Sequence, residues 1–272
     1  MKINLHLHSQ CSDGRLTTEE LAEKMKTSNY KVVALTDHDT VEGIPDMVKN
    51  CRVRGVRLIP GIEVTSFVPQ ELRLYDDTYK VHIVGLNIDT EKMQVFLSEH
   101  NGKKIEYHSK ILEQYGIDAA CIKTSEISNR IFCAELLVRK NYFNSLDEAL
   151  SIFHCSEYIP EVEQVIEEIH EAGGIAVWAH PFILPRNGDF KITPETVDVL
   201  TSYFVDCGLD GMEGYYLQFS LEEQTFIEKL CQKNNLYCST GTDYHADYDW
   251  EENLLKIKGK IDSKLLSALL DK

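Results

Sequence analysis

Seven short apolar segments alternate with helical patterns along most of this chain, and that alternation limits the fold more than any other feature. The expected strands span residues 2–7, 31–36, 57–63, 80–87, 174–179, 210–215 and 236–241. Helix-start signals stand between them, such as the run Thr17-Thr18-Glu19-Glu20, which resembles a capping box, and the first-turn proline Pro194. Strands that alternate with helices favour an α/β fold with a mainly parallel sheet.

One region interrupts this rhythm. Residues 90–158 contain no convincing strand and have helical patterns at 91–114, 130–140 and 146–153. We expect this region to be a helical insertion over the face at which the strands end. The barrel-like domain would then comprise residues 1–89 and 159–272.

Histidines and carboxylates gather at the ends of the expected strands. The first strand ends in His6-Leu7-His8, and alternate strand residues share one face, so both imidazoles point to the same side. Similar motifs recur in Thr36-Asp37-His38-Asp39, Gly61-Ile62-Glu63, Val81-His82-Ile83, Ala179-His180-Pro181 and Gly241-Thr242-Asp243-Tyr244-His245. Active sites of β/α barrels lie at the C-terminal ends of the strands. These residues should therefore meet there and bind divalent metal ions.

Some polar residues allow more than one interpretation. Asp13 is expected to be a ligand because it closely follows His8, although a plain turn before Gly14 would also suit it. Asp37 and Asp39 could each orient an imidazole from outside the metal shell, and Asp39 could instead cap the next helix. Four histidines in helical regions are expected to be structural: His100, His108, His154 and His170.

The composition narrows the classes of partner. The chain has 272 residues, 43% of them hydrophobic, and a formal net charge of −16. Such a charge disfavours duplex nucleic acid and anionic membranes, whereas bound metal ions would still attract a small phosphorylated substrate. No apolar run approaches membrane-spanning length, no N-terminal signal is visible, and the eight cysteines are scattered singly. The sequence therefore predicts a cytoplasmic protein with reduced thiols, and it leaves the oligomeric state open.

The order of the motifs resembles that of the PHP (polymerase and histidinol phosphatase) family of metal-dependent phosphoesterases. The motifs follow one another over nearly the whole chain. Within the family the chain is most similar to the branch that acts on nucleoside monophosphates and 3′,5′-bisphosphates. That similarity lies in Asp13, the segment Val81–Asp89 and the helical insertion after it.

This resemblance implies a distorted (β/α)7 barrel with two or three divalent metal ions. Mixed imidazole and carboxylate ligands suit Mn²⁺, Fe²⁺ or Zn²⁺ better than Mg²⁺, which prefers oxygen. The implied ligand sets, with Glu63 as the bridge, are His6, His8, Glu63 and Asp243 for the first ion, Asp13, His38 and His245 for the second, and Glu63, His82 and His180 for the third.

Two arginines are the expected substrate contacts. Arg130 matches an arginine of the bisphosphate branch and can bind a phosphate through two hydrogen bonds, or it can be a solvated helix charge. Arg186 follows the Ala-His-Pro motif and can make a second phosphate contact. Phe132 stands where the branch has a histidine. It can offer a stacking face to the substrate or pack in the core of the insertion.

These features together predict an enzyme that hydrolyses a small phosphomonoester, such as a nucleotide or nucleoside 3′,5′-bisphosphate, by a metal-activated hydroxide. The expected catalytic residues are Glu63, which bridges the metals, and His180 and His245. Either histidine, or a metal-bound water, could protonate the leaving oxygen. Three alternatives remain open. They are a histidinol-phosphate phosphatase, an amidohydrolase-type metal hydrolase, for which no well-placed lysine is visible, and a metal-binding module without catalysis.

Overall fold

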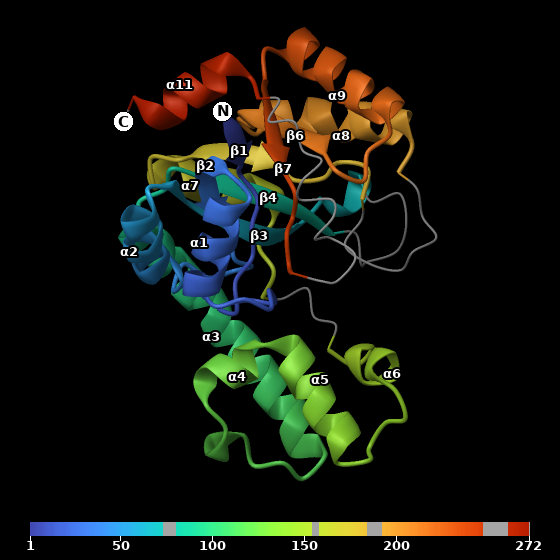
Figure 1. The fold of residues 1–272 in the computed structure, drawn as a ribbon. Coiled ribbons are helices and arrows are strands. Elements are labelled where there is room, and N and C mark those ends of the chain that lie inside the picture. The colour runs from blue at the N-terminus through green and yellow to red at the C-terminus, as the bar shows by residue number, and fades with distance from the viewer. Residues whose placement is uncertain (73–79, 154–157, 184–191, 247–260, 272) are drawn as a thin grey trace.

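Seven strands form one sheet whose spatial order follows the sequence (Figure 1). The structure, a computed structural model, describes residues 1–72, 80–153, 158–183, 192–246 and 261–271. All seven predicted strands are confirmed, as β1 (Lys2–Asn4), β2 (Tyr30–Leu35), β3 (Arg57–Phe67), β4 (Lys80–Leu86), β5 (Ile175–Trp178), β6 (Gly211–Tyr216) and β7 (Tyr237–Gly241). Backbone N–H groups of Leu5 and His8 donate to the carbonyls of Thr240 and Tyr244, so the last strand lies beside the first. The fold is thus the expected distorted (β/α)7 barrel.

The direction of β4 departs from the otherwise parallel sheet. β4 is antiparallel to both β3 and β5, whereas the remaining neighbours are parallel. In the described part of the link between β3 and β4, the only helical element is the short 3₁₀ turn η1 (Gln70–Leu72). Parallel neighbours are usually joined by a crossover helix, whereas antiparallel neighbours need none. Because β4 is antiparallel to β3, His82, near the start of β4, lies opposite Thr65, near the end of β3.

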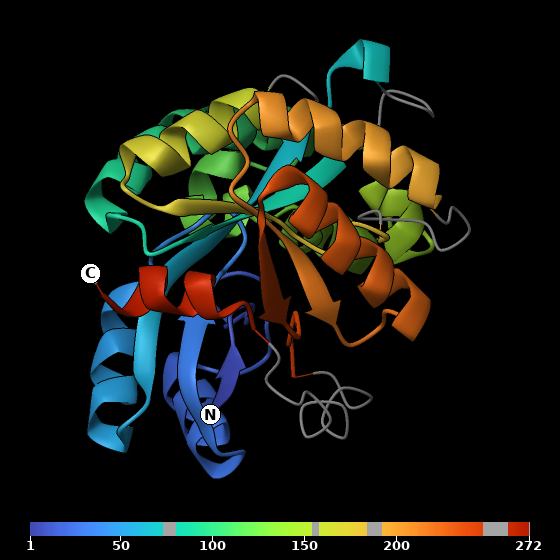
Figure 2. The ribbon, with the colours of Figure 1, turned by 90° about the horizontal axis from the view of Figure 1, so that it is seen from above.

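Amphipathic helices cover the outside of the strands (Figures 1 and 2). They are α1 (Thr18–Thr27), α2 (Ile44–Arg54), α7 (Val162–Glu171), α8 (Pro194–Asp206) and α9 (Leu221–Asn234). Their ends follow the sequence signals, because α1 begins with the capping box of Thr17 and Glu20, and Thr193 caps α8 before Pro194. Gly173 follows α7 with a φ of 73°, a conformation that glycine adopts without strain. These helices bury the larger apolar core against the sheet.

A second apolar cluster is formed by alternate strand residues and by α11 (Ser263–Leu270). It includes Ile59 of β3, Val84 of β4 and Val177 of β5, packed with Leu265 and Leu269 of α11. Figure 2 shows α11 lying across the strands near the N-terminus of the chain.

The insertion is helical, as predicted, and has a core of its own. It contains α3 (Thr90–Gln114), the 3₁₀ turn η2 (Ala119–Cys121), α4 (Thr124–Ser128), α5 (Arg130–Arg139) and α6 (Leu146–Leu150). The second half of α3 packs with α5 and α6 in a separate apolar cluster, whereas Met93, Phe96 and Leu97 of its first turns belong to the barrel core. Helix α3 therefore links the two cores (Figure 1). Of the helices that the structure describes, none combines the length and apolarity needed to cross a membrane.

Candidate metal centre

The nine residues predicted as metal ligands converge around one buried carboxylate. Glu63 lies inside β3, which continues to Phe67 instead of ending at residue 63 as expected. Its Oε1 lies 3.0 Å from His82 Nδ1 and 3.1 Å from His180 Nε2. Its Oε2 lies 3.1 Å from His6 Nε2 and 3.2 Å from ring nitrogens of His8 and His38. The structure therefore brings together His6, His8, Asp13, His38, Glu63, His82, His180, Asp243 and His245.

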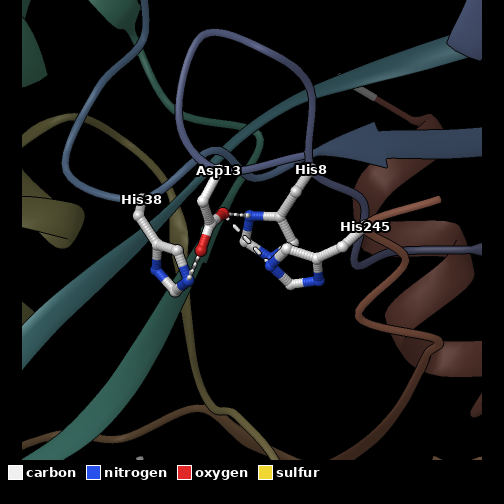
Figure 3. Close-up of side chains that lie close together, drawn as sticks. All are labelled: His8, Asp13, His38 and His245. Atoms are coloured by element: carbon white, nitrogen blue, oxygen red, sulfur yellow. Dashed lines mark ion pairs between the residues drawn. The ribbon is translucent and has the colours of Figure 1, made fainter. Parts of the chain in front are cut away.

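The donor atoms fall into three groups, in each of which they all lie within 4.8 Å of one another. The groups are His6, His8, Glu63 and Asp243; His8, Asp13, His38 and His245; and His38, Glu63 and His82. The first is the expected first ligand set, and the second adds His8 to the expected second set. In the third, His38 stands where His180 was expected, although His180 still contacts Glu63. Figure 3 shows Asp13 between the imidazoles of the second group, with Oδ1 3.1 Å from His245 Nε2.

The arrangement of polar atoms fits divalent cations. His6 Nε2 and His8 Nε2 lie 3.1 Å apart, and two neutral ring nitrogens that both present lone pairs would repel each other. Among the described residues, four buried atoms of the cluster have no hydrogen-bond partner: His8 Nδ1, His38 Nδ1, Glu63 Oε2 and Asp243 Oδ1. Buried polar atoms rarely remain unsatisfied, and cations between these groups would satisfy them.

The carboxylates give the cluster a strongly negative field. Burial opposes a charged His8, but the nearby carboxylates of Asp243 and Glu63 raise the pKa of its imidazole to about 10. Burial likewise opposes ionisation of Glu63, yet the surrounding imidazoles, His6 first among them, hold its pKa well below the usual value. His38 behaves differently, because burial lowers its pKa to about 4 despite the nearby Glu63. The same field that holds protons on the imidazoles would attract divalent cations.

Comparison with known proteins agrees with this geometry. The model of the PHP domain family matches residues 4–174. The chain belongs to the PHP family. It is a metal-dependent phosphoesterase of that family, and its candidate metal-binding groups are those described above.

Individual relatives match almost the whole chain. The 5′-3′ exoribonuclease Rnm of Salmonella typhimurium is 29% identical over 268 residues, which cover 92% of this chain and 87% of the relative. The 3′,5′-nucleoside bisphosphate phosphatase of Chromobacterium violaceum is 26% identical over 263 residues, which cover 90% and 87%. An amidohydrolase from Chromobacterium violaceum, solved with bound sulfate, has a TM-score of 0.72 at 24% identity and covers 99% of this chain and 97% of its own. That structure shows the shared fold.

Two aspartates of this PHP chain have roles other than those expected. Asp37 accepts hydrogen bonds from the backbone N–H and Oγ of Ser9 and from Ser12 Oγ, so it orders the loop that leads to Asp13. Asp39 accepts the backbone N–H of Thr65 at 3.0 Å. Helix α2 has Gly43 at its N-cap, so the capping role for Asp39 was wrong. Neither aspartate makes a hydrogen bond or ion pair to an imidazole of the described residues, and the orienting role was wrong too.

Sequence reasoning missed two residues that support the site. Glu213 on β6 contacts His6 Nδ1 at 3.2 Å and accepts the backbone N–H of His180 at 3.0 Å. The hydroxyl of Tyr216 donates to Asp243 Oδ2 at 3.1 Å. A carboxylate within an otherwise uncharged strand segment was the available signal for Glu213.

A cleft of about 610 Å³ lies between the metal-site residues and the insertion. Asp13, His38 and His82 line the barrel side, while Lys104 and Arg130 come from α3 and α5. The aromatic residues Phe96 and Tyr158 also line it. The cleft is thus lined by candidate metal ligands on one side and by basic residues on the other, with apolar residues as well.

Phe132 and Arg186, the other residues considered as substrate contacts, are not among the described residues that line the cleft. Phe132 packs against the core of the insertion, with the guanidinium of Arg139 5.9 Å above its ring, and it is not among the described residues that line the cleft. The packing alternative is therefore the one observed for Phe132. Arg186 lies outside the described residues.

Proposed function

We propose that this phosphoesterase removes a phosphate from a nucleotide-sized substrate with a second anionic group, such as a nucleoside 3′,5′-bisphosphate. The observation that carries the proposal is the cleft in which candidate metal ligands face Lys104 and Arg130. Its volume of about 610 Å³ suits one small ligand. A bisphosphate could place one phosphate at the metal ligands and the other at the basic residues, with the base against Phe96 or Tyr158.

We further propose that two or three Mn²⁺, Fe²⁺ or Zn²⁺ ions occupy the centre, held by the nine converging residues. When bound, such ions supply charge neutralisation for the phosphate and make hydroxide available from water near neutral pH. Glu63 lies where a carboxylate can serve more than one ion, because its two oxygens face different imidazoles. Of the two proposed proton donors, His245 has 22% of its side chain exposed against 6% for His180.

A second candidate is stepwise removal of nucleotides from the 5′ end of a short single-stranded RNA. The 29% identical relative named a 5′-3′ exoribonuclease favours it. The charge of −16 opposes contacts with a long phosphate backbone, so the substrate would be bound mainly at its end. A reducing compartment such as the cytoplasm is proposed for either activity, because the seven described cysteines are all free.

A substrate screen with Mn²⁺ tests the proposal. We expect release of inorganic phosphate from nucleoside 3′,5′-bisphosphates with a higher kcat/KM than from histidinol phosphate or a generic aryl phosphate. Release of nucleoside monophosphates from 5′-phosphorylated RNA oligomers would favour the exonuclease. A preference for histidinol phosphate, or turnover of amides alone, would contradict both candidates.

A further inference from the structure

Glu213 is a buried carboxylate that lies directly behind the metal-site histidines. Glu213 is 2% exposed, and it belongs to none of the three ligand groups found among the described residues. It lies on β6, where the register with β7 shifts between Glu213 and Tyr215. Such a bulge changes the direction of neighbouring side chains.

Both oxygens of this carboxylate are used, and on two different site residues. Oε1 lies 3.2 Å from His6 Nδ1. Oε2 accepts the backbone N–H of His180 at 3.0 Å, where the chain has a φ of 31° that side-chain-bearing residues rarely adopt. The Glu213 carboxylate thus restrains both the imidazole of His6, which follows β1, and the backbone of His180, which follows β5.

The space around Glu213 is shaped to this contact. A Cβ atom on Gly241 of β7 would lie 2.0 Å from Glu213 Oε1 and 2.4 Å from His6 Cβ. Only glycine therefore permits the carboxylate and the imidazole to approach at that point.

We propose that Glu213 is a positioning residue that sets the tautomer of His6 and the orientation of His180. When Glu213 accepts the Nδ1–H of His6, the lone pair of Nε2 faces Glu63, His8 and Asp243, where the first ligand group lies. A carboxylate behind a metal-binding histidine raises its basicity and fixes its ring. The proposal rests on the metal centre of the proposed function and is independent of the substrate.

Zn²⁺ binding by the full chain tests this role. Glu213→Gln keeps the size of the side chain but must turn an NH₂ group toward His6 or His180. We expect its affinity for Zn²⁺, measured by competition with a chelator, to fall about 10- to 100-fold while the circular dichroism spectrum is unchanged. Glu222→Gln, at an exposed position in the first turn of α9, should bind Zn²⁺ as the unmodified protein does.

The ¹⁵N resonances of the histidines in the unmodified, Zn²⁺-loaded protein provide a second measurement that does not depend on the variant folding. We expect His6 to carry its proton on Nδ1. A proton on Nε2, or equal Zn²⁺ affinity of folded Glu213→Gln and the unmodified protein, would overturn the positioning role. If the unmodified protein binds none of Zn²⁺, Mn²⁺ and Fe²⁺, the metal centre itself is wrong, and that outcome is distinct from the first two.

Discussion

At the scale of single residues, Glu63 has the most central position in the site. Five imidazoles lie 3.0–3.2 Å from its two oxygens, and the side chain is fully buried. Such a residue can link several ions only while it is charged. Its contribution should therefore be electrostatic rather than steric.

Glu63→Gln removes this charge and keeps the volume, so the fold should survive. We expect turnover of the best substrate to fall by about two or more powers of ten, equivalent to about 3 kcal/mol in the barrier. Steady-state kinetics with saturating Mn²⁺ measure the turnover, and elemental analysis measures the metal content of the variant. Glu91→Gln, in the exposed first turn of α3, is the matched control. Near-normal turnover of Glu63→Gln would rule out the bridging role.

Arg130 is the residue through which the insertion is expected to select the substrate. Arg130→Ala should raise KM for a nucleoside bisphosphate more than for a generic aryl phosphate that occupies only the metal ligands. Metal content should stay unchanged, because a guanidinium is always protonated and offers no lone pair to a cation. Equal loss of activity on both substrates, or no loss on either, would exclude a specificity contact.

The chain offers a control on the same helix. Arg139, in the last turn of α5, forms an exposed ion pair with Glu135 at 3.1 Å. Arg139→Ala removes the same charge away from the described lining of the cleft, so it should leave KM for both substrates unchanged.

At the scale of elements, His108 connects α3 to the end of α4. Its Nδ1 donates to the carbonyl of Ile127 at 2.6 Å, and the ring packs among Phe153 and Tyr158. Burial lowers the pKa of His108 to about 4, and the nearby charges of Lys104 and Arg130 act in the same direction. His108 therefore has the structural role expected for it, and it should make the stability of the folded protein depend on pH.

The sign of that dependence follows from proton binding. The unfolded chain binds a proton at His108 below about pH 6.5, whereas the folded protein binds it only near pH 4, so stability falls as pH drops through this range. Between pH 7 and pH 5 the loss should be about 2 kcal/mol for this one group. Denaturant unfolding of the unmodified protein and His108→Phe at both pH values should show a smaller loss in the variant. Parallel losses in the two proteins would contradict this assignment.

At the scale of the whole molecule, the acidic charge and the buried cluster should make folding depend on metal. Ions that bind only the folded state add about 2.7 kcal/mol of stability when their free concentration is 100 times Kd. For a chain of this size, that corresponds to a rise in Tm of about 5 °C or more. The unmodified protein carries a net charge of −16, so bound cations would also relieve repulsion.

Removal of metal by a chelator should therefore abolish activity and lower Tm, and added Mn²⁺ should restore both. Mg²⁺ at the same concentration should restore less, because imidazole-rich sites suit it poorly. Elemental analysis of protein purified without chelator should find two or three ions per chain. One ion or none, with no response to Mn²⁺, would contradict a multinuclear centre.

The sequence by itself determined the type and order of the elements and the residues that converge. Periodicity and capping are local properties, so the seven strands, the helices that begin at Thr18 and Pro194, and the helical insertion could be predicted. The strand-end motifs could also be predicted to meet, because strands in one sheet align their ends. Whether the nine residues bind metal stays a prediction.

Only the tertiary structure decided how these parts combine. The antiparallel direction of β4 brings His82 opposite Thr65, and it depends on a pairing that no local pattern records. Glu213 reaches His6 across 207 positions of the chain, so its role required β6, β7 and the segment after β1 to lie side by side. Helix packing likewise directed Phe132 into the insertion and Arg130 toward the cleft. The physical reason is the same in each case: these contacts join residues far apart in sequence, and the free energy of packing the whole chain selects among arrangements that local preferences leave equivalent.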